Sequence, residues 1–502
     1  MPSELKVLVS GASGYIGSRL VPRLLERGYK VRALSRSYEK LQGFSWASHP
    51  RVEILAQDLL DLEGLTRAAE GCDVAYYLVH SMNSQHRNFS DADRQAAENM
   101  VAACTKAELR RIIYLGGLGE QDDDLSAHLK SRAEVGHILQ SGSVPVTVFR
   151  AAMIIGSGSA SFEILRYLVE RLPFMITPKW VRTPSQPIAV RNVLHYLLDS
   201  LNHDETTGNV YDIGGPEILT YQQLMDIYAE EAGLTSRLVI PVPFFTPRLS
   251  SYWIHLVTPV PSYIARPLAD GLRNPAVCKE ERIREVIPQN LIGCREAIKL
   301  ALSNLQHERV ESHWTDAGAI PPSEWFYAGD PDWAGGTRYE DKRSLTIAAT
   351  KEEIWQPLVR LGGKTGWYYG DWLWKLRGLM DRLVGGVGLS RGRRHGRELK
   401  PGDALDFWRV VAVEPNKRLL LTAEMKLPGK AMLEFKIEET EPGHIKLTQT
   451  AKFLPSGLLG LAYWWAVTPL HNLVFGGMLR GIVSAAGSTR CSSIEMLGLN
   501  SV

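Results

Sequence analysis

The feature that most constrains this chain is the glycine-rich turn Gly11-Ala-Ser-Gly14-Tyr-Ile-Gly17, which directly follows the apolar run 5–9. A strand, such a turn and an amphipathic stretch, here 18–27, have the order of a dinucleotide-binding βαβ unit. The first glycine makes the tight turn, the second lets a pyrophosphate approach the backbone, and the third lets the helix pack on the strand. The N–H groups at the start of the helix attract phosphate. A turn without a nucleotide is the alternative. The predicted cofactor-binding residues of the turn are Gly11, Ser13, Gly14, Tyr15, Ile16 and Gly17.

Length and composition limit the number of domains and the classes of partner. The chain has 502 residues, which is too long for one core and indicates two to three domains. The 57 basic and 55 acidic side chains nearly balance, so no overall field favours nucleic acid as a partner. The 5 cysteines are scattered without a Cys-x-x-Cys pair, which indicates a reducing compartment and neither disulfides nor a metal site. The chain starts directly with a strand, so we expect no secretion signal and a cytoplasmic protein.

Apolar runs alternate with helical stretches along the first part of the chain. This alternation predicts an α/β Rossmann domain, a doubly wound parallel sheet with helices on both faces. Sheets of this type bind ligands at the carboxyl ends of their strands. The predicted later strands are 31–34, 52–55, 74–79, 112–115, 146–149 and 210–213, and the helical stretches between them include 62–69, 92–107 and 126–139.

The composition then changes twice. Segment 239–275 is apolar and interrupted by prolines, so the region of about 216–300 is either a substrate-side cap or material that packs against the core. A connector rich in proline, glycine and tryptophan covers 306–340 and marks a domain boundary. We therefore expect a first domain over 1–305 and a second domain over 341–490.

The second domain shows a different order of elements. Predicted strands at 344–349, 404–413, 418–425, 431–438 and 445–453 accompany a helix at 351–361 that Thr350 would cap. This order predicts an α+β fold in which a curved antiparallel sheet grips a long terminal helix around an apolar cavity. The uncharged segment 453–479 is long enough to span a bilayer, but its prolines and glycines favour a buried or cavity-lining helix. Peripheral contact with a membrane surface stays open.

Residues after the second, third and fourth strands bear on the choice of cofactor. Arg36 follows the second strand, where an enzyme that prefers NAD commonly places an acidic residue on the ribose hydroxyl. A guanidinium suits a 2′-phosphate, so the sequence favours NADP(H) over NAD(H), and a solvated arginine is the alternative. Asp58 either accepts a hydrogen bond from the adenine amino group or caps the following helix. Val79, His80 and Ser81 would run over the adenine ribose.

Four motifs together resemble one family. Gly11-xx-Gly14-xx-Gly17, Asp58-Leu59, Tyr77-Leu-Val-His80 and Phe149-Arg150 are similar to the extended or atypical short-chain dehydrogenase/reductases, in particular to the NmrA-like NAD(P)-binding proteins. The resemblance covers about residues 5–300 and implies that Leu59 and Arg150 belong to the cofactor site. It further implies that Met153 lines the nicotinamide side and that Gln186 closes the substrate cleft.

The chain departs from this family at the catalytic positions. Family enzymes protonate the substrate carbonyl with the tyrosine of a Tyr-x-x-x-Lys pair, whereas the corresponding helix here carries His128 and Arg132 on one face. Glycines of the run 116–119 replace the usual serine or threonine. His128 can act as an acid near neutral pH, and Arg132 can hold a ribose or a phosphate. The alternative is that both are ordinary surface residues in a domain that has lost its chemistry.

The second domain carries two further candidate regions. The aromatic patch 367–374 contains Trp372 and either lines an apolar ligand pocket or belongs to the core. Asp406 and Trp408 would share one strand face and offer a carboxylate beside an aromatic ring, unless Asp406 pairs with Arg409 or with the basic cluster 391–397. That cluster would bind a phosphate, a headgroup or a carboxylate, or be a solvated loop.

The second domain resembles the uncharacterised domain that follows some bacterial atypical short-chain dehydrogenase domains, and the helix-grip folds of the START and polyketide-cyclase type. The latter bind hydrophobic molecules, which implies a hydrophobic small-molecule ligand. Two functions remain. The first is an NADPH-dependent reductase for a quinone-like, isoprenoid or polyketide-like carbonyl compound. The second is a non-catalytic NADP(H)-binding protein that senses redox state or assists an assembly.

Overall fold

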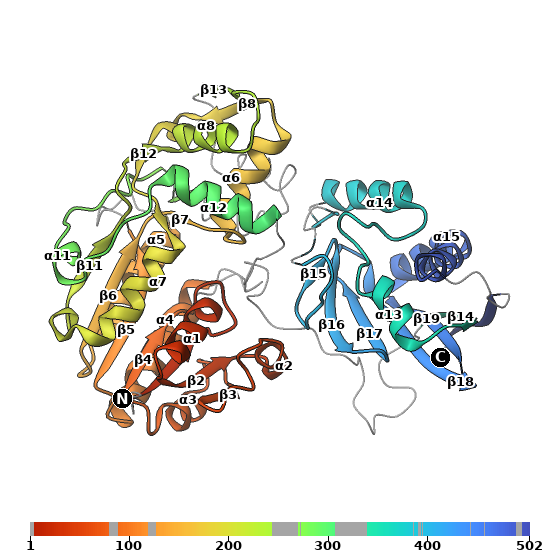
Figure 1. The fold of residues 1–502 in the computed structure, drawn as a ribbon, viewed down its shortest axis with the longest axis horizontal. Coiled ribbons are helices and arrows are strands. Elements are labelled where there is room, and N and C mark those ends of the chain that lie inside the picture. The colour runs from red at the N-terminus through yellow and green to blue at the C-terminus, as the bar shows by residue number, and fades with distance from the viewer. Residues whose placement is uncertain are drawn as a thin grey trace. The chain divides into compact units, whose positions relative to one another are not determined.

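The computed structural model describes residues 5–79, 89–118, 127–242, 270–271, 273–306, 339–384, 386–389, 393, 395–441, 443–455, 457–487 and 494–501. The chain divides into two compact units, Met1–Gly318 and Ala319–Val502. The division falls within the predicted connector 306–340, of which 307–338 lie outside the described residues. Each unit has its own sheet and its own core (Figure 1).

The first unit is built on a seven-stranded sheet with the strand order β11-β6-β5-β4-β1-β2-β3. All its neighbouring strands are parallel, so each connection crosses over the sheet. The strand order reverses at β1, and sheets of this type bind their ligands beside that point. The strands are β1 (Lys6–Ser10), β2 (Lys30–Ser35), β3 (Val52–Ala56), β4 (Val74–Tyr77), β5 (Arg111–Gly117), β6 (Val146–Ala151) and β11 (Val210–Ile213).

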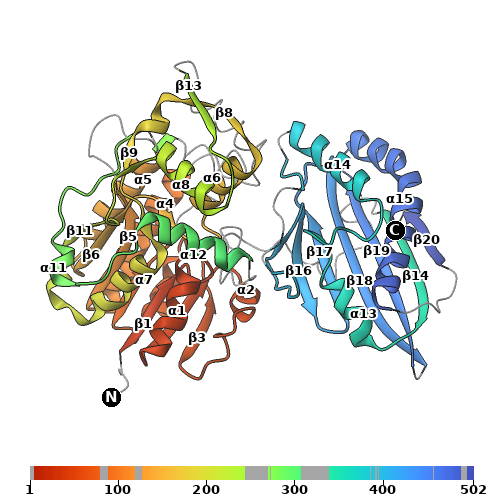
Figure 2. The same cartoon turned by 45° about the horizontal axis from the view of Figure 1, so that its top comes forward.

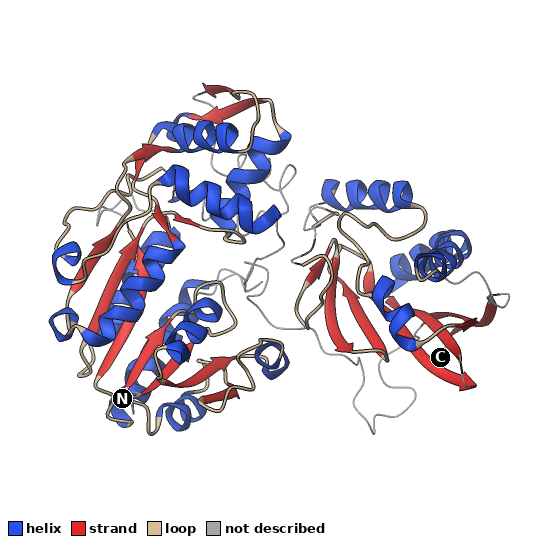
Figure 3. Ribbon diagram, viewed as in Figure 1, coloured by secondary structure: helices blue, strands red, loops and turns tan. Residues whose placement is uncertain are grey.

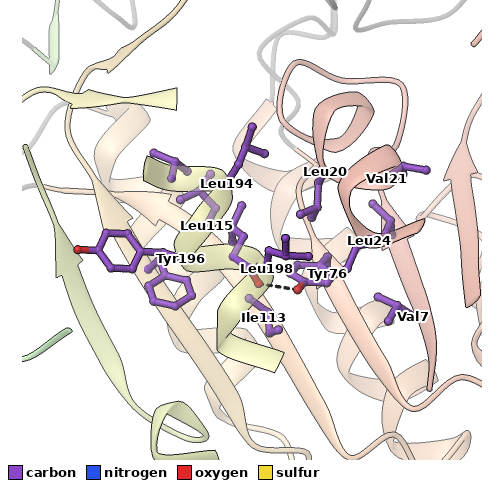
Figure 4. Close-up of a cluster of buried hydrophobic side chains, with 14 of the residues drawn as sticks. Val7, Leu20, Val21, Leu24, Tyr76, Ile113, Leu115, Leu194, Tyr196 and Leu198 are labelled. Atoms are coloured by element: carbon purple, nitrogen blue, oxygen red, sulfur yellow. Dashed lines mark hydrogen bonds between the residues drawn. The ribbon is translucent and has the colours of Figure 1, made fainter. Parts of the chain in front are cut away.

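Helices cover both faces of this sheet. On one face, Leu20 and Leu24 from the first helix and Leu194 from a later helix pack on Val7 and Tyr76 (Figure 4). These two helices are α1 (Gly17–Glu26) and α7 (Val190–Asp199), and the helices of the other face are α3 (Leu62–Ala69), α4 (Phe89–Lys106) and α5 (Ala127–Gln140), while α2 (Tyr38–Gln42) follows β2. The predicted doubly wound α/β fold is confirmed.

A second layer of this unit has its own core, formed mainly by α6 (Ala160–Arg171), α8 (Tyr221–Glu231) and α12 (Cys294–Gln306). This layer begins before the predicted cap at 216–300, because α6 belongs to it. Most of segment 239–275 lies outside the described residues. The layer also contains the strand pairs β7 (Ile154–Ile155) with β10 (Ile188–Ala189), β9 (Pro184–Ser185) with β12 (Leu219–Thr220), and β8 (Phe174–Pro178) with β13 (Leu238–Val242). Shorter helices are η2 (Lys179–Arg182), η3 (Ser200–Asn202), η4 (Asp204–Thr206) and α11 (Ile283–Val286).

The second unit is built on an antiparallel seven-stranded sheet with the order β15-β16-β17-β18-β19-β14-β20 (Figures 2 and 3). Three helices pack on it and share its apolar core. The strands are β14 (Tyr339–Ala348), β15 (Ala404–Leu405), β16 (Trp408–Glu414), β17 (Arg418–Ala423), β18 (Gly429–Glu441), β19 (His444–Pro455) and β20 (Glu495–Ser501), and the helices are α13 (Lys351–Leu358), α14 (Asp371–Leu383) and α15 (Gly457–Ala485).

Three features of this unit differ from the sequence-based expectation. The long helix α15 is not terminal, because β20 follows it and pairs with β14. The predicted strand 404–413 is a hairpin, since the chain turns at Asp406 and Phe407 between β15 and β16. Helix α14 forms where only an aromatic patch was expected. The predicted cap of α13 is confirmed, because the Thr350 side chain accepts a hydrogen bond from the Glu353 N–H group.

No helix in the described part of the chain combines the length and the apolar character needed to cross a membrane. The uncharged segment 453–479 runs from the end of β19 into α15, whose Met478 and Leu479 are buried against the sheet. Among the described residues, no three His, Cys, Asp or Glu side chains gather in a way that would hold a metal ion.

Candidate functional site

The glycine turn after β1 has a backbone geometry that only glycine allows at two positions. Gly11 has a φ of +77°, and a Cβ there would lie 2.8 Å from the carbonyl oxygen of Leu78. A Cβ on Gly17 would lie 2.2 Å from the carbonyl oxygen of Gly11, so the start of α1 packs directly on the turn. The Gly14 N–H group closes the turn by donating to the Gly11 carbonyl at 2.9 Å.

The start of α1 is open to an anion. Among the described residues, and apart from the chain neighbours of Gly14, a Cβ at that position would meet only the Gly11 carbonyl oxygen within 4 Å, at 3.2 Å. No side chain caps α1 at Ile16, and its first turn has no acidic residue. Helix α3, in contrast, is capped by Asp61. The absence of a capping side chain and the space beside Gly14 fit a pyrophosphate.

Contacts join this turn to the end of β2. The Ala12 N–H group donates to the Leu34 carbonyl at 3.0 Å, and the Ser13 and Ser35 hydroxyls lie 2.9 Å apart. Arg36 follows directly and is exposed. The described residues offer it no hydrogen-bond or ion-pair partner. Its guanidinium is therefore available beside the glycine turn.

Tyr15 joins the turn to the second layer of the unit. The Arg19 guanidinium lies over the Tyr15 ring, 4.4 Å from its centroid, and Arg19 donates to the Ser157 carbonyl at 2.8 Å. A Cβ on Gly156 would lie 2.4 Å from the Tyr15 hydroxyl oxygen. The ring thus packs between α1 and the loop after β7.

Asp58 does not cap helix α3, which was one of the two roles predicted for it, and its contact with an adenine stays a prediction. Its carboxylate accepts a hydrogen bond from the Leu60 N–H group at 3.0 Å and leaves the cap of α3 to Asp61, which accepts from Gly64 at 3.1 Å. That backbone hydrogen bond lowers the pKa of Asp61. Leu59 is buried.

Val79, two residues after the end of β4, lies against the first glycine of the turn. A Cβ on Gly11 would lie 3.2 Å from Cγ2 of Val79, so this residue borders the turn. His80 and Ser81 lie outside the described residues.

The end of β5 meets helix α5 through Arg132. Its guanidinium donates to the Leu115 carbonyl at 2.6 Å, and a Cβ on Gly117 would lie 3.4 Å from its Cδ. The Tyr114 hydroxyl donates to the Arg132 carbonyl at 3.0 Å, and burial raises the pKa of Tyr114. His128 lies one turn earlier in α5, and its side chain is outside the described residues. Arg132 therefore lies beside Gly117 at the carboxyl end of β5, the edge at which sheets of this type bind ligands.

Arg150 has a partner that the sequence did not reveal. Its guanidinium donates to the fully buried carboxylate of Asp212 at 2.7 Å, between the adjacent strands β6 and β11. Asp212 also accepts from the Lys279 N–H group at 2.9 Å. Asp212 thus links Arg150 to the segment around Lys279. A role of Arg150 toward a cofactor stays a prediction.

Met153 and Gln186 are both buried at the junction of the two layers. The Gln186 amide donates to the Gly215 carbonyl at 2.8 Å and accepts from the Cys278 N–H group at 3.0 Å. The Met153 carbonyl accepts from Ile188 at 3.0 Å. Gln186 holds two loops together, and a substrate contact for either residue stays a prediction.

In the second unit, Asp406 lies at the hairpin turn with a φ of +54° and is buried. Its carboxylate accepts from the Trp367 indole N–H at 3.0 Å and from the Gly363 N–H group at 3.2 Å. Burial raises the pKa of Asp406 to about 6, and these hydrogen bonds oppose the rise. Arg409 does not pair with it, because Arg409 donates to Glu424 at 3.0 Å.

Aromatic rings surround this carboxylate. Trp367 lies 6.2 Å from Trp408 and 5.4 Å from Trp374, measured between ring centroids, and Phe407 stacks on Trp367. Trp408 is buried, and its indole nitrogen has no hydrogen-bond partner among the described residues. Trp372 is 66% exposed on α14, so it does not belong to the core, and a ligand contact of this side chain stays a prediction.

The basic cluster 391–397 is only partly described. Arg393 donates to the backbone carbonyls of Val359 at 2.6 Å, Leu361 at 2.9 Å and His395 at 2.5 Å. Its guanidinium therefore braces the loop around Gly363 instead of facing a solvent anion.

Comparison with known proteins identifies the ligand class of the glycine turn. A family model described as NAD(P)H-binding matches residues 11–153. The first unit contains an NAD(P)H-binding Rossmann domain. A second family model, described as a protein of unknown function (DUF2867), matches residues 333–478. The second unit is thus a domain of a family without an assigned activity.

Relatives of known function are similar to parts of the NAD(P)H-binding unit. Cinnamoyl-CoA reductase 2 of Arabidopsis thaliana is 31% identical over 121 residues, which are 22% of this chain and 35% of that protein. The chloroplastic divinyl chlorophyllide a 8-vinyl-reductase of the same plant is 24% identical over 233 residues, 43% of this chain and 54% of that protein. The mitochondrial NADH dehydrogenase [ubiquinone] 1 alpha subcomplex subunit 9 of Arabidopsis thaliana is 24% identical over 234 residues, 45% of this chain and 57% of that protein. The chain thus spans from about a third to somewhat more than half the length of these relatives.

Proposed function

We propose that this protein is an NADP(H)-dependent oxidoreductase of the atypical short-chain dehydrogenase type that reduces a hydrophobic carbonyl or quinone-like compound. The observation that carries the proposal is the open, uncapped start of α1 on the glycine turn, next to the exposed Arg36. The names of two relatives, both reductases, support the reaction class. A cytoplasmic location belongs to the same proposal.

The preference for NADP(H) rests on Arg36 and its surroundings. The residues at the end of β2 are Ser35, Arg36 and Ser37, so no carboxylate is present there to bind a ribose 2′-hydroxyl or repel a 2′-phosphate. A guanidinium gives charge-assisted hydrogen bonds to a phosphate. We expect Arg36→Ala to weaken NADPH binding about tenfold or more and to leave NADH binding nearly unchanged.

Arg132 and His128 have separate roles in the proposed reaction. When bound, the nicotinamide supplies a hydride. Only one of the five N–H groups of the Arg132 guanidinium has a described partner, the Leu115 carbonyl, so the others are available to a ribose or phosphate oxygen. His128, one helical turn earlier, would donate the proton to the reduced carbonyl oxygen. Tyr114 cannot take this role, because its hydroxyl is buried and bonded to the Arg132 carbonyl.

The second unit would receive the hydrophobic substrate. Its antiparallel sheet with the long helix α15 agrees with the START-like, helix-grip arrangement that we propose for it. Asp406, Trp367 and Trp408 combine a buried carboxylate with large apolar rings. In this proposal the Asp406 carboxylate accepts a hydrogen bond from a polar group of the ligand and the rings contact its apolar part.

A specific observation favours a second candidate, a non-catalytic NADP(H) sensor or assembly factor. The end of β5 carries Gly116 and Gly117 and therefore no hydroxyl that could orient a carbonyl. The relative named as a subunit of NADH dehydrogenase fits an assembly role. In this candidate the cofactor binds but is not oxidised.

Cofactor titration of the full chain separates these functions. Nicotinamide fluorescence measures binding of NADPH and NADH, and the NADPH absorbance band then follows a panel of quinones and hydrophobic carbonyl compounds. Turnover that His128→Ala lowers while NADPH binding is kept supports the reductase. Tight binding without oxidation supports the sensor, and no binding of either cofactor contradicts both. Arg67→Ala, an exposed change on α3, is the charge-matched control for Arg36→Ala.

A further inference from the structure

Helix α14 presents an apolar face to solvent. Most of the large apolar side chains that are exposed in the described residues come from this helix, its flanks and α15. On α14 they recur at helical spacing along one side. These residues are Trp372, Leu376, Leu379, Met380, Leu383 and Val384, with exposed fractions between 48% and 73%. Buried Gly378 and Asp381 occupy the opposite side, which packs on the unit.

Helix α15 lies beside α14 and is apolar on its outer side as well. The Arg377 guanidinium lies 5.1 Å from the ring centroid of Tyr463, and a Cβ on Gly370 would lie 3.8 Å from Cγ2 of Val474. The two helices are therefore neighbours (Figure 2). The exposed large apolar residues of α15 are Leu459, Trp465, Leu470 and Leu473.

These exposed residues of α14 and α15 form what we call the helical face. The inner side of α15 faces the sheet, as burial of Met478 and Ile482 indicates. The inner side of α14 packs through Gly378 and Asp381 on the loop 386–389 and on Lys426. The apolar outer sides of these neighbouring helices are both exposed to solvent. Exposed apolar surface of this extent on neighbouring elements marks an interaction site.

The charges around the helical face are basic. Lys375 is exposed on α14, and Lys426 donates to the Val384 carbonyl at the end of that helix. Of the two acidic residues of α14, Asp381 is buried and accepts from the Gly388 and Lys426 N–H groups. Asp371 is exposed at the start of the helix, where its carboxylate accepts from the Trp367 N–H group. Helix α15 contains no acidic residue at all.

We propose that the helical face binds the surface of a membrane that contains anionic lipids. An apolar side with tryptophans and leucines, edged by lysines, is the pattern of helices that lie in the headgroup region. Each lysine near an anionic surface adds attraction. A second copy of this chain fits less well, because in a two-fold symmetric contact the exposed Lys375, Lys426 and Arg480 would face only one exposed acidic side chain of these two helices, Asp371. The proposal does not rest on cofactor binding.

The test is flotation of the full chain with vesicles of phosphatidylcholine alone and of phosphatidylcholine with phosphatidylglycerol. We expect binding to the anionic vesicles, weakened several-fold when salt is raised from about 0.1 M to about 0.5 M. Leu379→Glu combined with Leu383→Glu should lower the bound fraction about tenfold or more. Ile218→Glu, an equally exposed apolar position of the first unit, should leave binding unchanged.

A charge reversal gives an independent readout should the double variant fail to fold. Lys375→Glu should reduce binding to anionic vesicles about fivefold, whereas Lys417→Glu, at the turn between β16 and β17, should not. If the chain binds neither kind of vesicle, the proposal is overturned. A concentration-dependent dimer that Leu379→Glu with Leu383→Glu abolishes also overturns it, because the face would then bind a second copy. Retained NADPH binding in each variant shows that a lost vesicle contact is unrelated to the cofactor site.

Discussion

At the residue scale, the carbonyl oxygen of Gly11 determines what the cofactor turn tolerates. Because a Cβ on Gly17 would lie 2.2 Å from this oxygen, Gly17→Ala must push α1 away from the turn. We expect NADPH affinity to fall at least about tenfold, since strain of about 1–3 kcal/mol acts directly on the phosphate-binding backbone. Gly136→Ala in α5 is the control, because its Cβ would meet only Tyr114 at an ordinary 3.5 Å. Nicotinamide fluorescence titration of both variants decides, and equal affinities would contradict this account of the turn.

We expect the stability of the second unit to depend on pH through Asp406. Its pKa is raised from 3.8 to about 6 in the folded unit, mainly by burial, so the folded state holds more protons than the unfolded state between these values. Stability therefore falls as pH rises through this window, by about 3 kcal/mol in all, and levels off above it. Asp406→Asn keeps an acceptor for Trp367 and tolerates the positive φ, and it should flatten this dependence. Urea unfolding at pH 4.5 to 7.5 measures it, and an unchanged slope in the variant would assign the effect to another group.

At the scale of elements, the start of α13 is a local interaction that the sequence already indicates. Thr350 and Glu353 bond to each other's backbone N–H groups and so satisfy two donors at the helix end. Thr350→Ala should lower the free energy of unfolding of the second unit by about 1 kcal/mol, and Thr350→Ser should restore it. Chemical denaturation followed by tryptophan fluorescence tests this, and a loss that serine does not restore would point to packing of the methyl group instead.

The elements that the sequence predicts are those whose pattern is local. The central strands of the first sheet are buried on both faces and are therefore continuous apolar runs, such as β4. Helix α14 was missed because its pattern is inverted: the apolar residues that recur along one side face solvent, whereas Gly378 and Asp381 are buried. The hairpin at Asp406 was missed because it lacks the glycine or asparagine that usually occupies a left-handed turn position.

The candidate sites likewise contain one part that the sequence predicts and contacts that it does not predict. The glycine turn is one contiguous segment, and its role could be predicted from spacing alone. The partner of Arg150 lies 62 residues away on a neighbouring strand, and Trp367 lies 39 residues before Asp406. Neither pairing leaves a periodic signal, because the first depends on which strands become neighbours and the second on how the loop before α14 packs on the hairpin.

At the scale of the whole molecule, the two units have separate cores and only the first contains the NAD(P)H-binding segment. A ligand stabilises the part of a protein that it binds in the folded state, by about 2.7 kcal/mol at 100 times its Kd. We therefore expect two unfolding transitions in calorimetry, of which saturating NADPH raises only one. Gly17→Ala should abolish that shift, while Thr350→Ala should lower the other transition alone. A single transition that moves as a whole with NADPH would instead mean that the units unfold together, and a ligand of the second unit would then be coupled energetically to the cofactor of the first.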